Sequence, residues 1–323
     1  MENYLNNFVI ANNISKKEIL KILDENNING KITNIDYSFF KKIHIKIENE
    51  KKINHLKLCL DSYSISLAKN EAKGYLILNK FYKNKFNLID YKMIAANNNY
   101  SLSKMEFILG SKSSYFEFKR YYNYNFFNKL NTISLKKYIN KIKERYNLDP
   151  VFSLENELFE KNLNKLILNY ENLEIPLDVS HGDFIHYNTF KTVNKNYVFD
   201  LEFFESERSF LYDYFHWHLT PIFTKSIELN KIFNFVNHTY SIIIKILNRN
   251  LINNIFNYKK ILKGKILFKI LLILFLFERY MALAEVLNLK NLDVLIDKNQ
   301  KKLTKEHIKI IRNLFIKLTE KIE

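Results

Sequence analysis

The chain has 323 residues, of which 47% are hydrophobic and 26% charged; this composition supplies a large core, allows two lobes and excludes a wholly disordered protein. The 50 Lys and Arg against 34 Asp and Glu give a formal charge of +16, which suits nucleic acid, an anionic membrane or an acidic small molecule, although a lysine-rich solvated surface produces the same charge. The five glycines are widely spaced, which excludes a Walker A loop, a GxGxxG fingerprint and a GxSxG elbow.

Cysteine usage and hydrophobic runs indicate the compartment. Cys59 is the only cysteine, so no internal disulfide can form, as is usual in reducing compartments. The first residues, MENYLNNFVIANN, contain no long apolar core, so no signal peptide is predicted. The most apolar run, ILLILFLF at 270–277, is too short to span a bilayer. We therefore expect a cytoplasmic protein without a transmembrane segment.

Hydrophobic periodicity predicts an α+β protein with a mixed first part and a helical second part. In chain order we predict a helix at 15–26, strands at 31–38, 41–49 and 53–61, a helix at 64–82, strands at 88–98 and 103–113, helices at 132–147 and 153–172, a hairpin of 188–192 and 197–204, and helices from 210 onward. The change near Gly110 predicts a smaller N-terminal lobe at 1–110 and a larger, mainly helical lobe at 111–323.

The segment VSHGDFIHYNTF at 179–190 differs from the lysine- and asparagine-rich remainder of the chain. It carries Asp183 and Asn188 on a loop just before the predicted hairpin, and Asp200 lies on the second hairpin strand. Because a hairpin returns the chain to its start, Asp200 is expected to approach Asn188. Carboxylate and amide oxygens suit Mg²⁺, and Asp183 could accept a proton from a hydroxyl. The alternative is a turn whose side chains satisfy backbone groups.

The motifs HGDFIHYN and VFDLEFF resemble those of the aminoglycoside phosphotransferase and choline kinase group, the small-molecule branch of the protein-kinase-like fold. The resemblance implies a bilobal fold whose small N-terminal lobe has an antiparallel sheet and one helix, with ATP and Mg²⁺ as cofactors. It implies that Asp183 orients or deprotonates the acceptor hydroxyl. It also implies that Asn188 and Asp200 hold Mg²⁺ on the ATP phosphates, with help from Glu202.

The same resemblance requires a strand lysine on the ATP phosphates and a helix glutamate that holds it. Lys57 on a predicted strand and Glu71 on the following helix match in spacing and element type, and Lys46 is the alternative lysine. The hinge strand falls at MEFILG, where the backbone of four residues would meet adenine: Glu106, Phe107, Ile108 and Leu109. Two features depart from the family pattern. The turn SFFKK at 38–42 has no glycine. His55 stands two positions before Lys57, where a small residue usually lies under adenine.

Several further residues complete the implied site. His181 belongs to the HGD motif and is expected to support the catalytic loop. Asp213 resembles the family's helix aspartate that hydrogen-bonds this loop; the alternative is a carboxylate favoured by the dipole at a helix N-terminus. Three aromatic or imidazole side chains are possible substrate contacts: His186, Tyr187 and Trp217. For His186, a solvent-facing position is an equal alternative.

The expected function is transfer of the γ-phosphate of ATP to a hydroxyl of a small molecule. A sugar, a glycan intermediate or an amino alcohol is expected, because the basic chain does not favour polycationic aminoglycosides. The alternative is a catalytically inactive kinase-like module that binds a nucleotide or a partner. No specific nucleic acid is expected as a partner, since no recognised nucleic-acid module is found, and the oligomeric state is not predicted.

Overall fold

The computed structural model describes the following residues: 14–38, 40–49, 52–82, 86–114, 117, 131–146, 157–228, 265–288, 298–320 and 322. The chain packs into two compact units. The first contains 1–126, 181–205 and 293–296, and the second contains 127–180, 206–292 and 297–323. Both units mix helices and strands, so the predicted α+β class is confirmed. Because the units interleave along the chain, the division at residue 110 stays a prediction.

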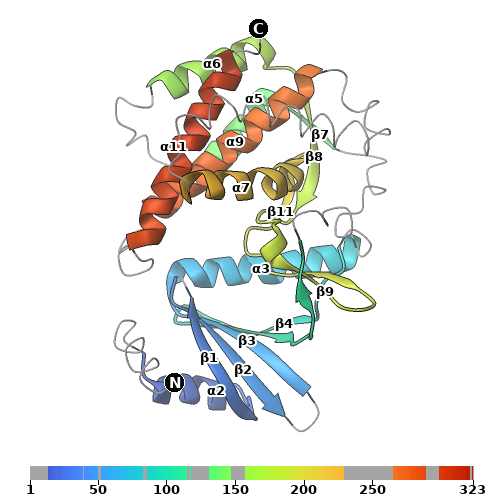
Figure 1. Ribbon diagram of the computed structural model, residues 1–323, viewed down its shortest axis with the longest axis vertical. Coiled ribbons are helices and arrows are strands. Elements are labelled where there is room, and N and C mark those ends of the chain that lie inside the picture. Colours follow the sequence, from blue (N-terminus) through green and yellow to red (C-terminus); the bar gives the residue numbers. More distant parts are fainter. Residues whose placement is uncertain are drawn as a thin grey trace. The chain divides into compact units, whose positions relative to one another are not determined.

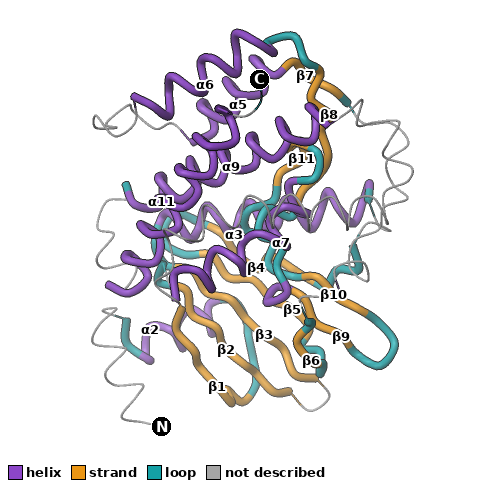
Figure 2. Tube along the Cα trace, turned by 45° about the horizontal axis from the view of Figure 1, so that its top comes forward, coloured by secondary structure: helices purple, strands orange, loops and turns teal. Residues whose placement is uncertain are grey.

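The first unit is built on a five-stranded antiparallel sheet, seen in orange in Figure 2. Its strand order is β1-β2-β3-β5-β4, and the strands are β1 (Lys31–Ser38), β2 (Lys42–Asn49), β3 (Lys52–Cys59), β4 (Tyr91–Ala96) and β5 (Ser101–Glu106). The first three strands form a meander, and β5 inserts between β3 and β4. The antiparallel sheet that the family resemblance implied is therefore present.

The two faces of this sheet are covered by different helices, α2 (Lys16–Glu25) and α3 (Ser62–Phe81), as Figure 1 shows. Side chains alternate between faces along a strand. On one face a buried cluster joins the sheet to α2: Ile19, Leu23, Ile43, Ile45, Ile47, Leu56, Leu58 and Leu102. Ser15 caps α2, because its Oγ accepts from the Glu18 N–H at 3.1 Å while Glu18 Oε2 accepts from the Ser15 N–H at 2.7 Å. Because side chains alternate, the strand residues between these buried positions point to the other face of the sheet, toward α3.

Helix α3 starts at a well-formed cap and carries an asparagine that binds the segment after residue 200. The carboxylate of Asp61 accepts from the Tyr63 and Ser64 N–H groups at 3.1 and 3.0 Å, which satisfies two donors at the helix start. About two turns further along the helix, Asn70 donates to the carbonyls of Glu202 and Phe204 at 2.9 Å each. These bonds hold the segment that follows residue 200 against α3.

The strands around the motif segment are shorter than predicted. The hairpin consists of β9 (Thr189–Lys191) and β10 (Asn196–Val198), joined by β6 (Ser111–Lys112) in a second sheet of order β10-β9-β6. The predicted strand at 197–204 is wrong beyond residue 198, because Asp200 adopts a left-handed backbone with φ 66° that cannot continue a strand. The strand predicted at 103–113 is likewise split into β5 and β6.

The second unit has a small sheet and five described helices. The sheet has the order β11-β8-β7, from β7 (Thr132–Ser134), β8 (Glu174–Ser180) and β11 (Glu205–Ser209). The helices are α5 (Leu135–Tyr146), α6 (Glu157–Tyr170), α7 (Tyr212–Glu228), α9 (Lys265–Leu287) and α11 (Lys298–Glu320). The apolar run 270–277 lies buried in α9. Helices predicted within 229–264 lie outside the described residues.

A buried polar cluster ties α9 to the sheet of the second unit. Glu278 is fully buried and binds Arg208 Nε at 2.7 Å, the Tyr138 hydroxyl at 2.9 Å and the Arg145 guanidinium. Such a carboxylate is stable inside a protein only when cations and donors surround it. Along the described parts of the chain, no helix has the length and apolar character needed to cross a membrane.

We predict that Gly74→Ala destabilises the first unit. A Cβ at this position of α3 would lie 2.8 Å from Cγ of Phe204 and 3.2 Å from Cβ of Leu201. The helix-propensity gain of up to about 1 kcal/mol is smaller than the usual overpacking cost of about 1–3 kcal/mol. Urea unfolding should show a net loss of about 1 kcal/mol or more. Lys73→Ala, at an exposed neighbouring position, should change stability by less than about 0.5 kcal/mol; equal stability of the two variants would contradict the close approach.

Candidate active site

A buried lysine surrounded by three carboxylates forms the centre of the first unit. Lys57 Nζ lies 2.9 Å from Glu71 Oε2, 3.0 Å from Asp200 Oδ1 and 3.0 Å from Glu202 Oε1. The ammonium has three donors, and each carboxylate takes one. The four residues come from β3, α3 and the segment after β10, so one cation connects three elements that are distant in the chain.

The strand pattern explains how Lys57 reaches this position. Leu56 and Leu58 lie in the core on the α2 side, so the alternation of β3 directs Lys57 to the opposite side, toward α3. The lysine and Glu71, predicted as a pair, are thus brought into contact. The alternative, Lys46, lies with its ammonium 4.5 Å from the centroid of the Phe107 ring. Lys46 therefore contacts the hinge segment, whereas Lys57 contacts the carboxylates.

Burial and charge set the protonation of this cluster. Burial disfavours the ammonium of Lys57, but Asp200, Glu202 and Glu71 outweigh it and raise the pKa of Lys57 well above its usual value. Burial raises the pKa of Glu71 to about 7, with only a partial offset from Lys57. Burial also raises the pKa of Asp200, but Lys57 and then Lys42 outweigh it, so that the pKa is lowered. Asp200 is therefore an ionised carboxylate at neutral pH.

The motif loop is held to the same segment by hydrogen bonds. His181 is fully buried, and its Nε2 lies 2.8 Å from the Phe199 carbonyl. Gly182 has φ 86°, a conformation that favours glycine. The Phe199 N–H donates to the Asn188 carbonyl at 3.2 Å, and Asn188 Nδ2 donates to Asp183 Oδ2 at 3.0 Å. The loop that carries Asp183 and Asn188 is thus fastened beside Asp200, as the predicted hairpin return required.

The donor set fits a divalent cation such as Mg²⁺. Carboxylate oxygens of Glu71, Asp200 and Glu202 lie within 4.8 Å of one another. Because the side-chain amide N–H of Asn188 donates to Asp183, the amide oxygen is the atom of Asn188 that can meet a cation. Hard oxygen donors of this kind suit Mg²⁺, which keeps several waters. Asp200 is the most accessible of the three carboxylates, with 34% of its side chain exposed against 4% for Glu202.

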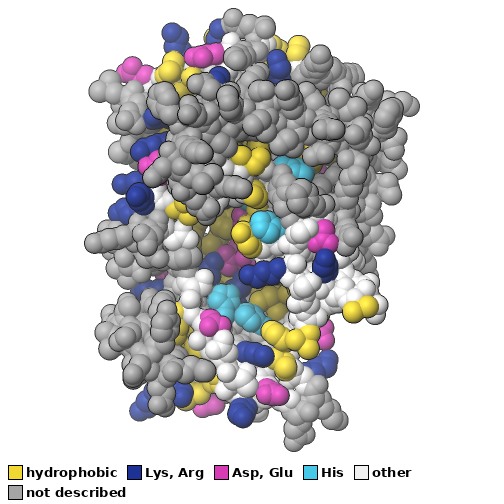
Figure 3. Space-filling model, in the orientation of Figure 1, with side chains coloured by type: hydrophobic (Ala, Val, Ile, Leu, Met, Phe, Trp, Pro, Cys, Tyr) yellow, Lys and Arg dark blue, Asp and Glu magenta, His cyan; other side chains and the backbone are white. Residues whose placement is uncertain are grey.

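A cavity of about 340 Å³ in the first unit lies next to these carboxylates. Its size is that of a small-molecule site. Its lining combines Asp200, Glu202 and Lys57 with aromatic and aliphatic side chains, and Figure 3 shows histidine, basic and acidic side chains gathered beside hydrophobic ones near the middle of the visible face. A ligand in this cavity can therefore bury an apolar ring and present a charged group to the lysine cluster.

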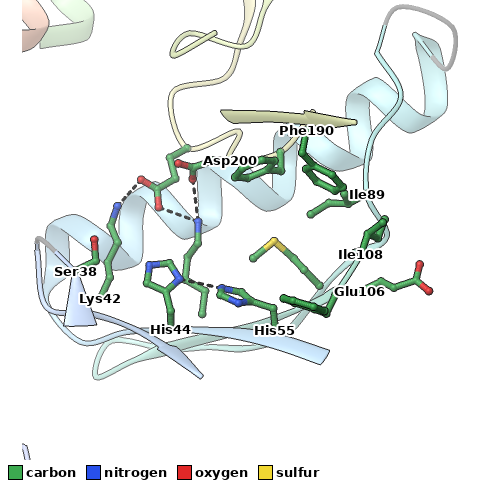
Figure 4. Close-up of a pocket in the computed structure, with 14 residues that line it drawn as sticks. Ser38, Lys42, His44, His55, Ile89, Glu106, Ile108, Phe190 and Asp200 are labelled. Carbon is green, nitrogen blue, oxygen red and sulfur yellow. Dashed lines mark hydrogen bonds and ion pairs between the residues drawn. The ribbon is translucent and has the colours of Figure 1, made fainter. Parts of the chain in front are cut away.

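Three of the four predicted hinge residues line this cavity. Glu106, Phe107 and Ile108 line it, whereas Leu109 is 81% exposed and is absent from the lining. Figure 4 shows the carboxylate of Glu106 directed away from the other lining side chains. The N–H groups of Glu106 and Phe107 donate within the unit, to the carbonyls of Asp90 and Ile53 at 3.2 Å each. These two amides are therefore not donors to a base.

Two histidines form another part of the lining. His44 Nδ1 lies 2.9 Å from His55 Nε2, and both rings rise from the strands into the cavity (Figure 4). Burial, then His55 and Lys57, lowers the pKa of His44 to about 3, and burial followed by Lys57 lowers the pKa of His55. Both rings are thus neutral at pH 7, and one donates to the other. His44 was missed from the sequence, although its alternation with Ile43 and Ile45 indicates its face.

The remaining predicted residues lie in different surroundings. Asp213 accepts from the Ser180 hydroxyl at 2.7 Å, at the end of β8; its role toward the catalytic loop stays a prediction. Tyr187 is 59% exposed, and His186 is partly buried. Trp217 has no exposed surface and is packed inside the second unit. Its prediction as a substrate contact is corrected, because a fully buried ring presents nothing to a ligand.

We predict that His44→Leu reduces the acid sensitivity of folding. The unfolded imidazole takes up a proton below its usual pKa of about 6.5, while the folded one stays neutral down to about 3. The neutral imidazole therefore makes its full contribution to the free energy of unfolding above pH 6.5, and this contribution decreases as the pH falls toward 3. Urea unfolding at pH 7.5 and 5.5 should show that the variant loses about 1 kcal/mol less than the unmodified protein. Lys46→Leu, on the same strand, should keep the original pH dependence; an identical pH loss in His44→Leu would refute the buried neutral imidazole.

Comparisons with known proteins agree on the fold. No protein-family model and no curated protein matches the sequence. The structure is similar to a Ralstonia eutropha JMP134 protein assigned as an aminoglycoside phosphotransferase, with a TM-score of 0.51 at 12% identity over 95% of this chain and 98% of that chain. A thermostable mutant of aminoglycoside phosphotransferase APH(4)-Ia in apo form gives a TM-score of 0.51 at 10% identity over 90% of this chain and 97% of that chain.

A further similar structure is a ternary complex. It is another thermostable mutant of APH(4)-Ia, bound to AMP-PNP and hygromycin B, with a TM-score of 0.50 at 11% identity over 91% of this chain and 97% of that chain. At these identities the likeness concerns the fold. The chain therefore has the protein-kinase-like fold of the aminoglycoside phosphotransferases, which confirms the fold that the motifs HGDFIHYN and VFDLEFF led us to expect.

Proposed function

We propose that this protein is an ATP- and Mg²⁺-dependent phosphotransferase that acts on a hydroxyl group of a small molecule. The observation that carries the proposal is the contact of Lys57 with Glu71 and Asp200 at the wall of a cavity of ligand size. The bond between Asn188 and Asp183 adds a second polar group, in a loop whose Asn188 carbonyl accepts from the N–H of Phe199 in the cavity lining. The similarity to a phosphotransferase bound to AMP-PNP and hygromycin B supports a nucleotide and a small acceptor as ligands.

Each residue has a role in the proposed reaction. The apolar lining with Phe107 and Ile108 takes the adenine ring, and Lys57 would exchange one of its carboxylate contacts for a phosphate oxygen. Asn188 and Asp200, with Glu202, would hold Mg²⁺, which supplies neutralisation of the charge on the phosphates. These groups act mainly by positioning and by electrostatic stabilisation.

Asp183 is the proposed base. The bond from Asn188 Nδ2 to Asp183 Oδ2 orients its carboxylate. In the proposed step the acceptor oxygen bonds to the γ-phosphorus, the bond from that phosphorus to the bridging oxygen breaks, ADP leaves, and the hydroxyl proton passes to Asp183. A sugar, a glycan intermediate or an amino alcohol is the proposed acceptor, since the charge of +16 does not favour a polycation.

The test is ATP-dependent phosphorylation of a metabolite mixture, followed by mass spectrometry. The unmodified protein with ATP and Mg²⁺ should add one phosphate to a hydroxylated compound. Asp183→Asn should lower the rate by about 10²–10⁴-fold, because it removes the base, while nucleotide binding persists. Asp200→Ala should weaken Mg²⁺-dependent nucleotide binding. Asp90→Asn, which changes an exposed carboxylate of the same unit, should leave both properties intact.

The possible failures separate the two candidate functions. Mg²⁺-dependent ATP binding without transfer to any acceptor would favour the inactive binding module. Lack of ATP binding by the folded protein would overturn both. Full transfer by Asp200→Ala would show that the metal assignment is wrong.

A further inference from the structure

The turn between β1 and β2 has a left-handed backbone but contains no glycine. Phe40 has φ 60° and Lys41 has φ 47°, values that residues with a branched or bulky side chain rarely adopt. The turn closes at the pair of Ser38 and Lys42. Because a strained conformation persists only where its surroundings enforce it, other contacts must hold this turn in place.

Aromatic contacts fasten this turn to α3. The ring centroid of Phe40 lies 5.1 Å from that of Tyr63, in the first turn of the helix. Lys42 Nζ lies 5.6 Å from the Phe40 ring centroid. In a glycine-rich turn, backbone N–H groups cover the phosphates of a nucleotide. In this turn the Phe40 ring packs against Tyr63 of α3, and Ser38 and Lys42 line the cavity next to the turn.

Lys42 is held deep in the cavity by a shared carboxylate. Only 11% of its side chain is exposed, and its ammonium is paired with Glu202. The other oxygen of Glu202 lies 3.0 Å from Lys57 Nζ. Figure 4 shows Lys42 extending from β2 toward the segment of Asp200. A lysine at this depth needs an anion beside it, so any movement of Lys42 away from Glu202 requires another anion.

The charges of the cluster favour such an exchange when a polyphosphate enters. Two lysines, Lys42 and Lys57, face the carboxylates of Glu71, Asp200 and Glu202. A polyphosphate adds negative charge next to this excess of carboxylates, and the repulsion falls if a lysine turns to the phosphate. Glu202 keeps its contact with Lys57 when Lys42 leaves, so the exchange does not strand a buried carboxylate without a partner.

We propose that Lys42 is a second phosphate-binding lysine, which exchanges its ion pair with Glu202 for the terminal phosphates of a bound nucleotide. In a glycine-rich turn, backbone N–H groups contact the phosphates; in this protein the side chain of Lys42 would make that contact. The inference rests on the nucleotide site proposed above, and it assigns Lys42 a role in distinguishing nucleotides by their phosphate number.

The experiment compares the binding of AMP-PNP and adenosine to Lys42→Met, by calorimetry with Mg²⁺ present. Loss of a charge-assisted contact should weaken AMP-PNP binding about tenfold or more. Adenosine binding should change by less than about twofold, because adenosine has no phosphate. Lys42→Arg should restore most of the AMP-PNP affinity, since a guanidinium also binds phosphate.

Lys46→Met is the matched control. It removes a positive charge from the same face of the same strand, but Lys46 contacts the Phe107 ring and is not part of the cavity lining. This variant should keep the difference in affinity between AMP-PNP and adenosine. A thermal unfolding curve of each variant shows whether it is folded at the temperature of the titration, and Lys42→Gln, which also removes the charge, serves if Lys42→Met is not.

The outcomes distinguish this inference from the proposed function. Failure of the unmodified protein to bind AMP-PNP would overturn the nucleotide site itself. If the unmodified protein binds AMP-PNP and Lys42→Met binds it equally well, the nucleotide site stands and the role of Lys42 is refuted. An equal loss for AMP-PNP and adenosine in Lys42→Met would also refute it, because Lys42 would then only shape the cavity.

Discussion

The buried ammonium of Lys57 is the constraint on which the first unit depends. An ammonium taken out of water is tolerated only when nearby anions compensate for the lost hydration. Its three carboxylate partners come from α3 and from the segment after β10, so the charge can be accommodated only when these elements meet at β3. The bonds of Asn70 to Glu202 and Phe204, and the close approach at Gly74, then hold that segment on the helix.

The cluster has more carboxylates than lysines, and this imbalance matters for what it can bind. Lys57 and Lys42 oppose Glu71, Asp200 and Glu202, with Asp183 nearby on the motif loop. In the proposed function such a cluster would attract a divalent cation, and a polyphosphate would enter only together with cations. The neutral histidine pair beside it adds no charge at pH 7. The cavity therefore offers one charged wall and one largely uncharged wall.

One face of the sheet packs in the hydrophobic core, and the other face lines the cavity. Isoleucines and leucines of β2 and β3 pack against α2, while the alternate positions carry Lys42, His44, His55 and Lys57. Since neighbouring side chains on a strand point to opposite faces, a single strand contributes to the core and to the cavity without conflict. Changes on the polar face can thus alter ligand binding without removing the packing that stabilises the sheet.

Much of the site was predictable from local spacing. The approach of Asp200 to the loop of Asp183 and Asn188 follows from a hairpin, whereas Lys57 and Glu71 were expected because the motif resemblance requires a strand lysine and a helix glutamate. The backbone at Asp200 was not predictable, because its left-handed φ of 66° depends on the surrounding contacts. The same is true of Trp217, whose burial depends on how α7 packs.

By itself, the sequence determined the types of most elements of the first unit, the face on which Lys57 lies, and the residues that local turns bring together. These features depend on periodicity and on short chain segments. Only the tertiary structure decided that Lys42 shares Glu202 with Lys57, that His44 pairs with His55, and that Lys46 lies on Phe107. Lys42 and Glu202 are 160 positions apart, and alternation specifies a face but not the distance between two side chains on it.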